Sequence, residues 1–412
     1  MNKRTYRSAV LLAAVLTLGL VAGAHGRSSA TGRAGADPGV TPTSILLGGT
    51  VPLSGEASAA AGTARGAEAY FKYVNSRGGV LGRKITYRFV DDGYDPGRTV
   101  QATRELVQQD KVFAIFNPIG TAHNLATRPF LNQLGVPQLF VASGFSAWGK
   151  EARRYPWTIG LIPSYVGEGL IYARHLIQTR PRAKIAIIYQ DDEYGKDLIS
   201  GFKRGLRGGA RIVAQQSYDP TSADVQSQIA KLKSSGADTL MVFAFGKFAI
   251  QSLVYVKKLS WRPQIYVNAV AASTSVMLIA ATSGQTEGVI SIVFFKDPAG
   301  AGAARDPGLK LFRTIIKRHL RGASPNDGYL VAGMASAYTM VETLRKAGRN
   351  LTRRGVIAAA NRLDIRSNPF VVKGIRIKTS PGDHFPIEQA RLQRWRKGVW
   401  VPFGKLVSAP RG

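Results

Sequence analysis

The chain reads, from residue 67 to residue 116, AEAYFKYVNSRGGVLGRKITYRFVDDGYDPGRTVQATRELVQQDKVFAIF. A helical pattern ends at the glycine pair Gly78-Gly79, a strand-like run follows, and Asp95-Pro96 precedes the next helical pattern. A glycine pair ends a helix in a left-handed cap, and Asp-Pro sets a turn and pre-forms the first helical residue. The stretch therefore predicts a βαβ unit.

The same order recurs from residue 197 to residue 245, which reads DLISGFKRGLRGGARIVAQQSYDPTSADVQSQIAKLKSSGADTLMVFAF. Here the glycine pair is Gly208-Gly209, and Asp219-Pro220 is expected to open the next helix. The chain is thus predicted to carry two similar βαβ lobes in tandem. Because ligands of open α/β sheets bind at the carboxyl ends of strands, two such lobes suggest a site in the cleft between them.

Short β-branched runs mark the other strands, and amphipathic helical stretches lie between most of them. Strands are predicted at residues 45–53, 85–90, 112–116, 138–141, 185–189, 212–216, 240–245, 265–268 and 289–295. Continuous apolar runs such as IAIIY and LMVFAF are typical of parallel strands buried on both faces, so we predict a doubly wound α/β fold. Helices at 309–320, 329–347 and 353–361 and antiparallel strands at 374–377 and 391–402 complete the chain.

The first residues predict export. Basic residues at positions 3, 4 and 7 precede an apolar run from 9 to 24, which ends in small residues. We interpret residues 1–24 as a signal peptide and 25–42 as a flexible leader. A membrane anchor is the alternative, although the run is shorter than the ~20 residues that a span requires. We expect the protein outside the cytoplasm, in the periplasm or on the extracellular face of the cytoplasmic membrane.

The composition narrows the classes of function. The chain has 412 residues, 45% of them hydrophobic, which is enough for two or three globular domains. With no cysteine, this chain offers no disulfide, no thiol chemistry and no lipid-modified cysteine. The sequence contains no nucleophile elbow, phosphate loop or zinc-type histidine spacing, so we expect no catalysis, metal or cofactor. Among its histidines, only His123 falls near the site predicted below.

The formal net charge of +31 would attract any polyanion. A nucleic-acid-binding protein is therefore a rival hypothesis. Such proteins concentrate basic residues on one helix or arm, or interleave them with stacking aromatics. Here the charge is spread along the chain, most densely over residues 345–412. We expect no nucleic-acid partner, and an anionic envelope surface or an arginine-rich bias explains the excess equally well.

A series of motifs resembles the leucine/isoleucine/valine-type solute-binding proteins of ABC importers. The opening from 53 to 100 has the Ser-Gly turn, the Asn-x-x-Gly-Gly helix end and the Asp-Asp pair before Asp-Pro. The likeness continues through GVP, ASGFSAWGK, QDDEYGKDL, SWRP, FFKDPAG and GIRIKTSPGDHFPIEQ. It spans nearly the whole chain after the leader. Each motif alone is weak, whereas their order and spacing together are specific.

The resemblance implies a type I periplasmic-binding-protein fold, with two Rossmann-like lobes joined by three crossovers. Residues 43–160 and 291–372 would form lobe one, and residues 161–290 and 373–405 would form lobe two. It implies a binding protein that closes over a small carboxylate-bearing ligand and delivers it to a membrane permease. We expect a monomer. A sensor that presents the ligand to a receptor is the alternative.

The resemblance also implies ligand contacts. The family holds the ligand carboxylate at a loop that corresponds to Gly120 and Thr121, where the N–H groups of a helix start suit an anion. A second loop corresponds to Ser143 and Gly144, and Tyr194 would close over the ligand from lobe two. The alternatives are a plain N-cap for Thr121 and plain packing for Tyr194. For Asp192 we expect helix capping, and for Phe145 and Trp148 packing.

The departures from the family matter as well. Amino-acid binders of the family have an acidic residue after the strand at 265–268, where this chain has Asn268-Ala269-Val270. A buried ammonium would lack its charge partner there, so an aromatic or aliphatic acid becomes a candidate ligand beside an amino acid. Lys247, at a predicted helix start, could clamp a carboxylate with Asn268 adding its amide. A solvated lysine is the alternative for Lys247.

Overall fold

Five parallel strands form the first sheet, sheet one, in the order β2-β1-β3-β4-β5. They are β1 (Ser44–Val51), β2 (Lys84–Asp91), β3 (Ala114–Phe116), β4 (Gln138–Val141) and β5 (Thr158–Gly160). The computed structural model describes residues 37–349 and 351–410, so the predicted signal peptide lies outside the described residues. Of the predicted leader, residues 37–42 are described, and Val40 forms a bridge with Ile45 of β1.

Sheet two has seven strands in the order β14-β13-β10-β9-β8-β6-β7. Its parallel part consists of β6 (Lys184–Gln190), β7 (Arg211–Tyr218), β8 (Thr239–Phe243), β9 (Gln264–Val267) and β10 (Ile290–Val293). The strands β13 (Gln389–Arg396) and β14 (Val399–Ser408) join the β10 edge as an antiparallel pair. Every residue of β8 is buried, as expected for a strand covered on both faces.

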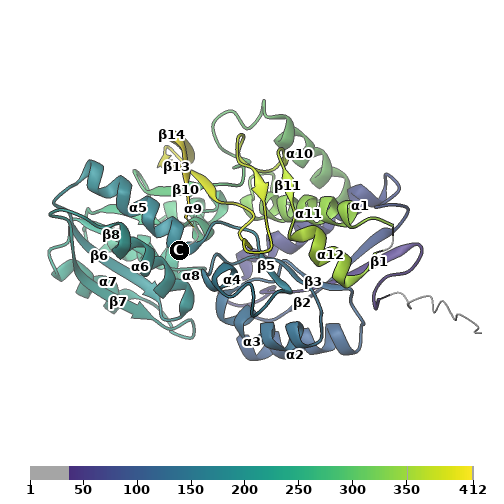
Figure 1. Cartoon of the computed structure of the whole chain (residues 1–412). Helices are drawn as coiled ribbons and strands as arrows, with labels where there is room; N and C mark the ends of the chain where they lie inside the picture. Colours follow the sequence, from purple (N-terminus) through teal and green to yellow (C-terminus); the bar gives the residue numbers. More distant parts are fainter. Residues whose placement is uncertain (1–36, 350, 411–412) are drawn as a thin grey trace, which may run out of the picture. The chain divides into compact units, whose positions relative to one another are not determined.

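Helices cover both faces of sheet one (Figure 1). On one face α1 (Gly62–Asn75) packs against α10 (Pro307–His319) and α11 (Gly328–Ala347), and on the other α2 (Pro96–Gln108) packs against α3 (Thr121–Gln133). The remaining helices are α4 (Ala147–Lys150), α5 (Tyr165–Thr179), α6 (Glu193–Gly205), α7 (Gln226–Ser234), α8 (Lys247–Lys258), α9 (Thr274–Ala281), α12 (Arg353–Ala360) and the short η1 (Ser58–Ala61) and η2 (Ala269–Ala271).

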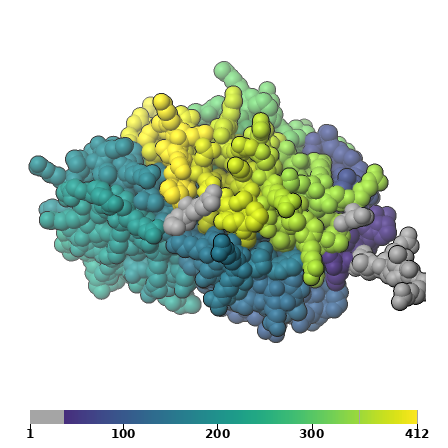
Figure 2. Space-filling model, viewed as in Figure 1, coloured from purple at the N-terminus to yellow at the C-terminus, as the bar shows by residue number. Residues whose placement is uncertain are grey.

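The chain passes between the two sheets three times. It leaves sheet one after β5, returns after β10 so that α10 and α11 pack on α1, and crosses again to place β13 and β14 in sheet two. A two-stranded ribbon of β11 (Asp364–Ile365) and β12 (Ile377–Lys378) lies within the last crossover, and the yellow C-terminal segment forms part of the surface in Figure 2. The predicted doubly wound fold is confirmed, whereas the residue boundaries of the two lobes stay a prediction.

The second repeat departs from the prediction made at Asp219-Pro220. In the first repeat Asp95 caps α2, since its side chain accepts from the Arg98 N–H at 2.8 Å. In the second, Asp219 accepts from the Thr221 N–H at 2.7 Å instead, which closes a tight turn. The helix α7 begins only at Gln226, so the prediction that this Asp-Pro opens a helix is wrong.

The strand β5 was not predicted because a run as short as Thr158–Gly160 has no measurable alternation.

Among residues 37–349 and 351–410, no helix combines the length and the apolar character needed to cross a membrane. The same residues contain no group of three or more histidine and carboxylate side chains placed to hold a metal ion.

Candidate functional site

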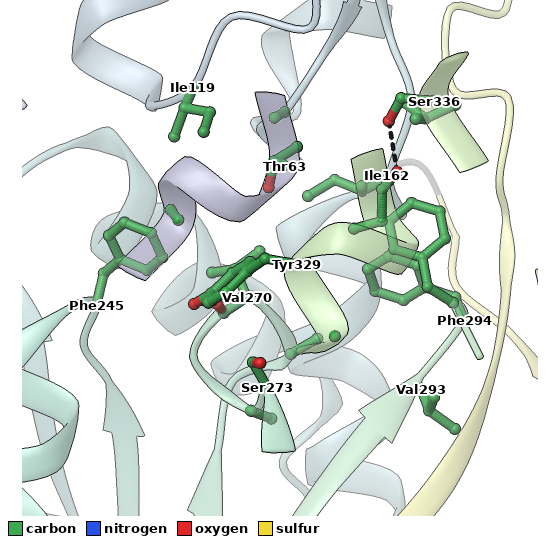
Figure 3. A pocket seen from close by; sticks show the side chains of 18 of the residues that line it. Thr63, Ile119, Ile162, Phe245, Val270, Ser273, Val293, Phe294, Tyr329 and Ser336 are labelled. Carbon is green, nitrogen blue, oxygen red and sulfur yellow. Dashed lines mark hydrogen bonds between the residues drawn. The ribbon is translucent and has the colours of Figure 1, made fainter. Parts of the chain in front are cut away.

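A cavity of about 150 Å³ lies where the carboxyl ends of strands from both sheets face each other. Sheet one contributes the residues that follow β3 and β4, and sheet two contributes those that follow β8, β9 and β10 (Figure 3). They include Ile119, Gly120, Thr121, Ala142, Phe245, Ala269, Val270 and Phe294. This is the position at which open α/β sheets bind ligands.

The walls of the cavity are mostly apolar and aromatic. Four tyrosines take part, one each from the β2–α2 loop, α5, α6 and α11: Tyr94, Tyr165, Tyr194 and Tyr329. The rings of Tyr165 and Tyr194 meet edge to face, with centroids 5.1 Å apart. Burial raises the pKa of both phenols, so they remain neutral hydroxyl groups. Such walls suit an apolar ligand body with a few polar groups.

Gly120 and Thr121 both line the cavity. Gly120 occupies the N-cap of α3 with φ 96°, and no side chain caps the first turn of the helix. Thr121 is therefore not the N-cap but the first helical residue, and its side chain is buried. The open helix start and the Thr121 hydroxyl give this end of the cavity donors for an anion.

Ser143 and Gly144 lie behind the wall rather than in it. The Ser143 hydroxyl is fully buried and shares a hydrogen bond of 2.7 Å with Thr121 Oγ1. The Gly144 carbonyl accepts from the Tyr165 N–H at 2.7 Å, and a Cβ on Gly144 would lie only 2.3 Å from the Pro163 carbonyl oxygen. This loop orients Thr121 and Tyr165, which do line the cavity.

Tyr194 lies in the wall, and Asn268 lies behind it. Asp192 caps α6 by accepting from the N–H groups of Tyr194 and Gly195, as predicted. The Asn268 side chain is fully buried. With its amide nitrogen donating to the Ala244 carbonyl at 2.9 Å, its amide oxygen accepts from Tyr194 Oη at 2.8 Å. Asn268 thus orients the tyrosine.

Lys247 does not line the cavity, and it pairs with a residue on the sheet-one side. Its Nζ lies 2.7 Å from Glu56 Oε1, and its backbone N–H donates to the Glu56 carbonyl at 3.1 Å. Glu56 follows β1, so the pair ties the two sides together. A cation at the start of α8 is unfavourable unless an anion lies close by, because it opposes the helix dipole. Glu56 supplies that anion.

A second tie is buried. The backbone N–H and the hydroxyl of Ser146, which follows β4, both donate to the carboxylate of Asp197 on α6, at 2.8 Å each. Asp197 is 9% exposed, so water competes little for these bonds. The sequence showed no signal for this contact, because its partners lie far apart along the chain.

His123 and Trp148 take packing positions. His123 is buried beneath Tyr94, with ring centroids 4.4 Å apart, and burial lowers the pKa of its imidazole. It neither lines the cavity nor reaches solvent. Trp148 is buried against Phe145, and its indole N–H donates to the Ser143 carbonyl at 3.0 Å. Packing was predicted for both aromatics.

Several polar residues of the wall were missed in the sequence. Lys296 and Asp297, in the quoted motif FFKDPAG, both line the cavity, and so do Asn117 and Gln393. Lys296 Nζ binds Asp306 at 2.7 Å, and Asp297 Oδ1 accepts from Thr274 Oγ1 at 2.7 Å. Burial raises the pKa of the Asp297 carboxyl. The sequence could have identified Asn117 and Lys296 as candidate site residues, because each of them directly follows a predicted strand.

Known proteins share this architecture. The family model described as periplasmic binding protein matches residues 44–399. The Leu/Ile/Val-binding protein homolog 7 of Brucella abortus (strain 2308) is 26% identical over 386 residues, which cover 90% of this chain and 92% of that protein.

Two solved structures show the same fold. One is a branched-chain amino acid ABC transporter protein from Thermus thermophilus with bound valine, at a TM-score of 0.77 and 19% identity, covering 90% of this chain and 97% of that one. The other is a solute-binding protein from R. palustris in complex with benzoate, at a TM-score of 0.74 and 18% identity, covering 89% and 97%. The match over most of the chain, together with a cavity between two doubly wound sheets, shows that this chain belongs to the periplasmic binding protein family, whose members bind solutes and are not enzymes.

Proposed function

We propose that this protein captures a small carboxylate-bearing ligand in the cavity between its two lobes and delivers it to the permease of an ABC importer. The observation that carries the proposal is the cavity itself, whose walls come from the carboxyl ends of both sheets. A ligand there contacts both sides at once. It therefore favours the closed form by its differential affinity for that form.

The wall offers one distinct place for a carboxylate. Gly120 and Thr121 present an uncapped helix start and a hydroxyl group at one end of an otherwise apolar cavity. Tyr194 faces the same cavity from sheet two and adds a neutral hydroxyl group. Ser143, Gly144 and Asn268 support these contacts from behind the wall.

Related proteins agree with this ligand class. The Thermus thermophilus protein holds valine and the R. palustris protein holds benzoate, and both molecules join a carboxylate to a compact apolar body. Lys247 is not needed as a carboxylate clamp in this proposal, because Glu56 already neutralises it. We place the protein outside the cytoplasm, in accordance with its family and with the predicted signal peptide.

The experiment is a thermal-shift and calorimetric screen of the protein after unfolding and refolding to remove any carried-over ligand. A ligand that binds only the native state adds ~2.7 kcal/mol of stability at a hundredfold excess over its dissociation constant. Valine, leucine, benzoate and aliphatic acids form the first panel. Failure of every carboxylate to bind would refute the proposed ligand class.

Salt dependence separates this function from polyanion binding. Polyanion binding falls steeply between about 50 and 200 mM salt because counterions are released, whereas binding of a small acid inside a cavity changes little. A sensor that serves a receptor would give the same binding curve as an importer component. Uptake assays in cells that contain or lack this protein distinguish those two roles, because only an importer component is needed for transport of the ligand.

A further inference from the structure

The charged residues around sheet two are separated along the direction of its strands. Four stretches of chain lead into the amino ends of β6, β7, β8 and β9: residues 180–184, 203–211, 231–238 and 257–263. They contain one carboxylate, Asp238, and twelve basic residues, of which all but Arg180 are exposed. We call this surface the basic end. Its basic residues are Arg180, Arg182, Lys184, Lys203, Arg204, Arg207, Arg211, Lys231, Lys233, Lys257, Lys258 and Arg262.

The opposite ends of the same strands are acidic. The stretches that follow them are residues 191–197, 219–225, 244–247 and 268–273. They contain only two lysines but six carboxylates: Asp191, Asp192, Glu193, Asp197, Asp219 and Asp224. Three of these stretches contribute residues to the cavity wall, so the basic end lies at the edge of sheet two that points away from the cavity.

The helix dipole explains only part of the basic end. A helix end carries a partial negative charge that attracts cations, and the last turns of α6, α7 and α8 hold six of the twelve basic residues. The other six lie in connections and at strand starts. Within the described part of the chain, Arg180 alone of these six forms an ion pair, with Asp238 at 3.3 Å.

Two of the cations are placed directly opposite each other. Lys184 begins β6 and Arg211 begins β7, and the two residues are partners in the register of these neighbouring strands. Both side chains are exposed. Like charges that lie directly opposite on neighbouring strands destabilise a sheet. An anion that lies against both of them would relieve this repulsion.

The basic end extends in two dimensions. The strands β9, β8, β6 and β7 are neighbours in sheet two, with a spacing of about 4.8 Å. They form the teal part of Figure 1 together with α5, which packs on α6, and α7, which packs on α8. The single aromatic residue of the four stretches, Trp261, is 8% exposed, and its indole N–H donates to the Ala237 carbonyl at 3.0 Å. Because proteins hold nucleic-acid strands by stacking bases on exposed aromatics, this arrangement fits a flat anionic surface better.

We propose that the basic end attaches this protein to the anionic headgroups of a lipid bilayer. Clusters of lysine and arginine are attracted by the negative surface potential of such a bilayer, which acts within a Debye length, about 8 Å at physiological salt. The contact holds an exported binding protein at the membrane reversibly, without the lipid-modified cysteine that this chain lacks. The inference goes beyond the proposed function and does not depend on it, because the basic end lies away from the cavity.

Co-sedimentation with lipid vesicles tests the proposal, with the protein in the form that cells export. One set of vesicles contains phosphatidylcholine alone, and in the other set about a third of the lipid is phosphatidylglycerol. We expect the protein to bind only the anionic vesicles. This binding should disappear between about 50 and 500 mM salt, because the Debye length shortens.

A quadruple variant removes one cation from each of the four stretches: Lys184→Gln, Arg211→Gln, Lys231→Gln and Arg262→Gln. All four side chains are exposed, so the variant should still unfold cooperatively. Each cation lost near an anionic bilayer weakens binding about fivefold, so the variant should bind the anionic vesicles more than about a hundredfold more weakly.

A matched control loses the same charge elsewhere, at exposed positions in and just after α10, which packs against α1. Its substitutions are Lys310→Gln, Lys317→Gln, Arg318→Gln and Arg321→Gln. The control should keep its affinity for the anionic vesicles within about fivefold.

The outcomes are distinct. Failure of the unmodified protein to bind the anionic vesicles would show that the proposal is wrong. An equal loss in both variants would mean that net charge alone drives the binding, which would overturn the assignment to the basic end. If polyphosphate or an oligonucleotide binds through the same four residues and the vesicles do not, the partner is a soluble polyanion and not a bilayer.

Discussion

Buried Glu168 should make this protein less stable as the pH rises, and the substitution Glu168→Gln should remove that loss. Glu168 lies on α5 and is 2% exposed. Its Oε1 accepts from Tyr172 Oη at 2.7 Å and from the N–H of Ala269, a cavity-lining residue, at 2.6 Å. Burial raises the pKa of Glu168 from 4.5 to about 7, against the opposing effect of these two hydrogen bonds.

The sign follows from proton binding in the two states. Below pH 4.5 the carboxyl group is protonated in both the folded and the unfolded chain. Between pH 4.5 and about 7 the unfolded chain has lost the proton while the folded protein keeps it, so the free energy of unfolding falls as the pH rises. The slope is about 1.4 kcal/mol per pH unit, which amounts to a loss of about 3 kcal/mol above the upper pKa.

The assay is urea unfolding of the wild type and of Glu168→Gln at pH values between about 4.5 and 8. The glutamine can accept both hydrogen bonds but does not titrate. The two proteins should have similar stability at the acid end, and the variant should be more stable by about 3 kcal/mol at the alkaline end. Glu287→Gln, which removes an exposed carboxyl group, is the control. A difference between wild type and Glu168→Gln that is constant with pH would refute the reasoning.

Three further predictions concern the cavity and the ties across it. Thr121→Ala combined with Tyr194→Ala should weaken ligand binding about thirtyfold in calorimetry, and urea titration should show that the protein still unfolds cooperatively, although with lower stability because two buried side chains are truncated. Normal affinity would move the site elsewhere. Asp197→Ala should lower ligand affinity about a hundredfold, because it removes the two bonds that Ser146 donates to Asp197. X-ray scattering should show a more open protein, and unchanged scattering would contradict a role in closure. Lys247→Ala should change ligand affinity less than about fivefold in calorimetry, since it breaks only a half-exposed ion pair, and a larger loss would make Lys247 a ligand contact.

Local patterns along the chain predicted most of the elements. The strands β1, β2, β4 and β6 begin and end within two residues of their predicted limits. For β4 and β6 the signal is a continuous apolar run, which a parallel strand buried on both faces requires. The edge strand β2 has an alternation of exposed and buried residues instead. The failure at Asp219-Pro220 has a local cause too, since one aspartate side chain can close a turn as readily as it caps a helix.

Only some of the predicted contact residues line the cavity. Gly120, Thr121 and Tyr194 line the cavity, whereas Ser143, Gly144, Lys247 and Asn268 lie outside its wall. A motif shows that a residue follows a strand, but it does not show whether the side chain points into the cavity or supports a neighbour. Their roles in ligand binding stay predictions.

The order of short apolar runs and glycines, together with the Asp-Pro pair at residues 95–96, predicted the two doubly wound sheets and the expected site at their carboxyl ends. This works because periodicity and turn chemistry act over a few residues. The tertiary structure alone brought Glu56 to Lys247, Ser146 to Asp197, and Asn117, Asp297 and Gln393 to one cavity. These contacts join residues far apart in the chain, and they depend on how the two sheets meet, for which no local pattern exists.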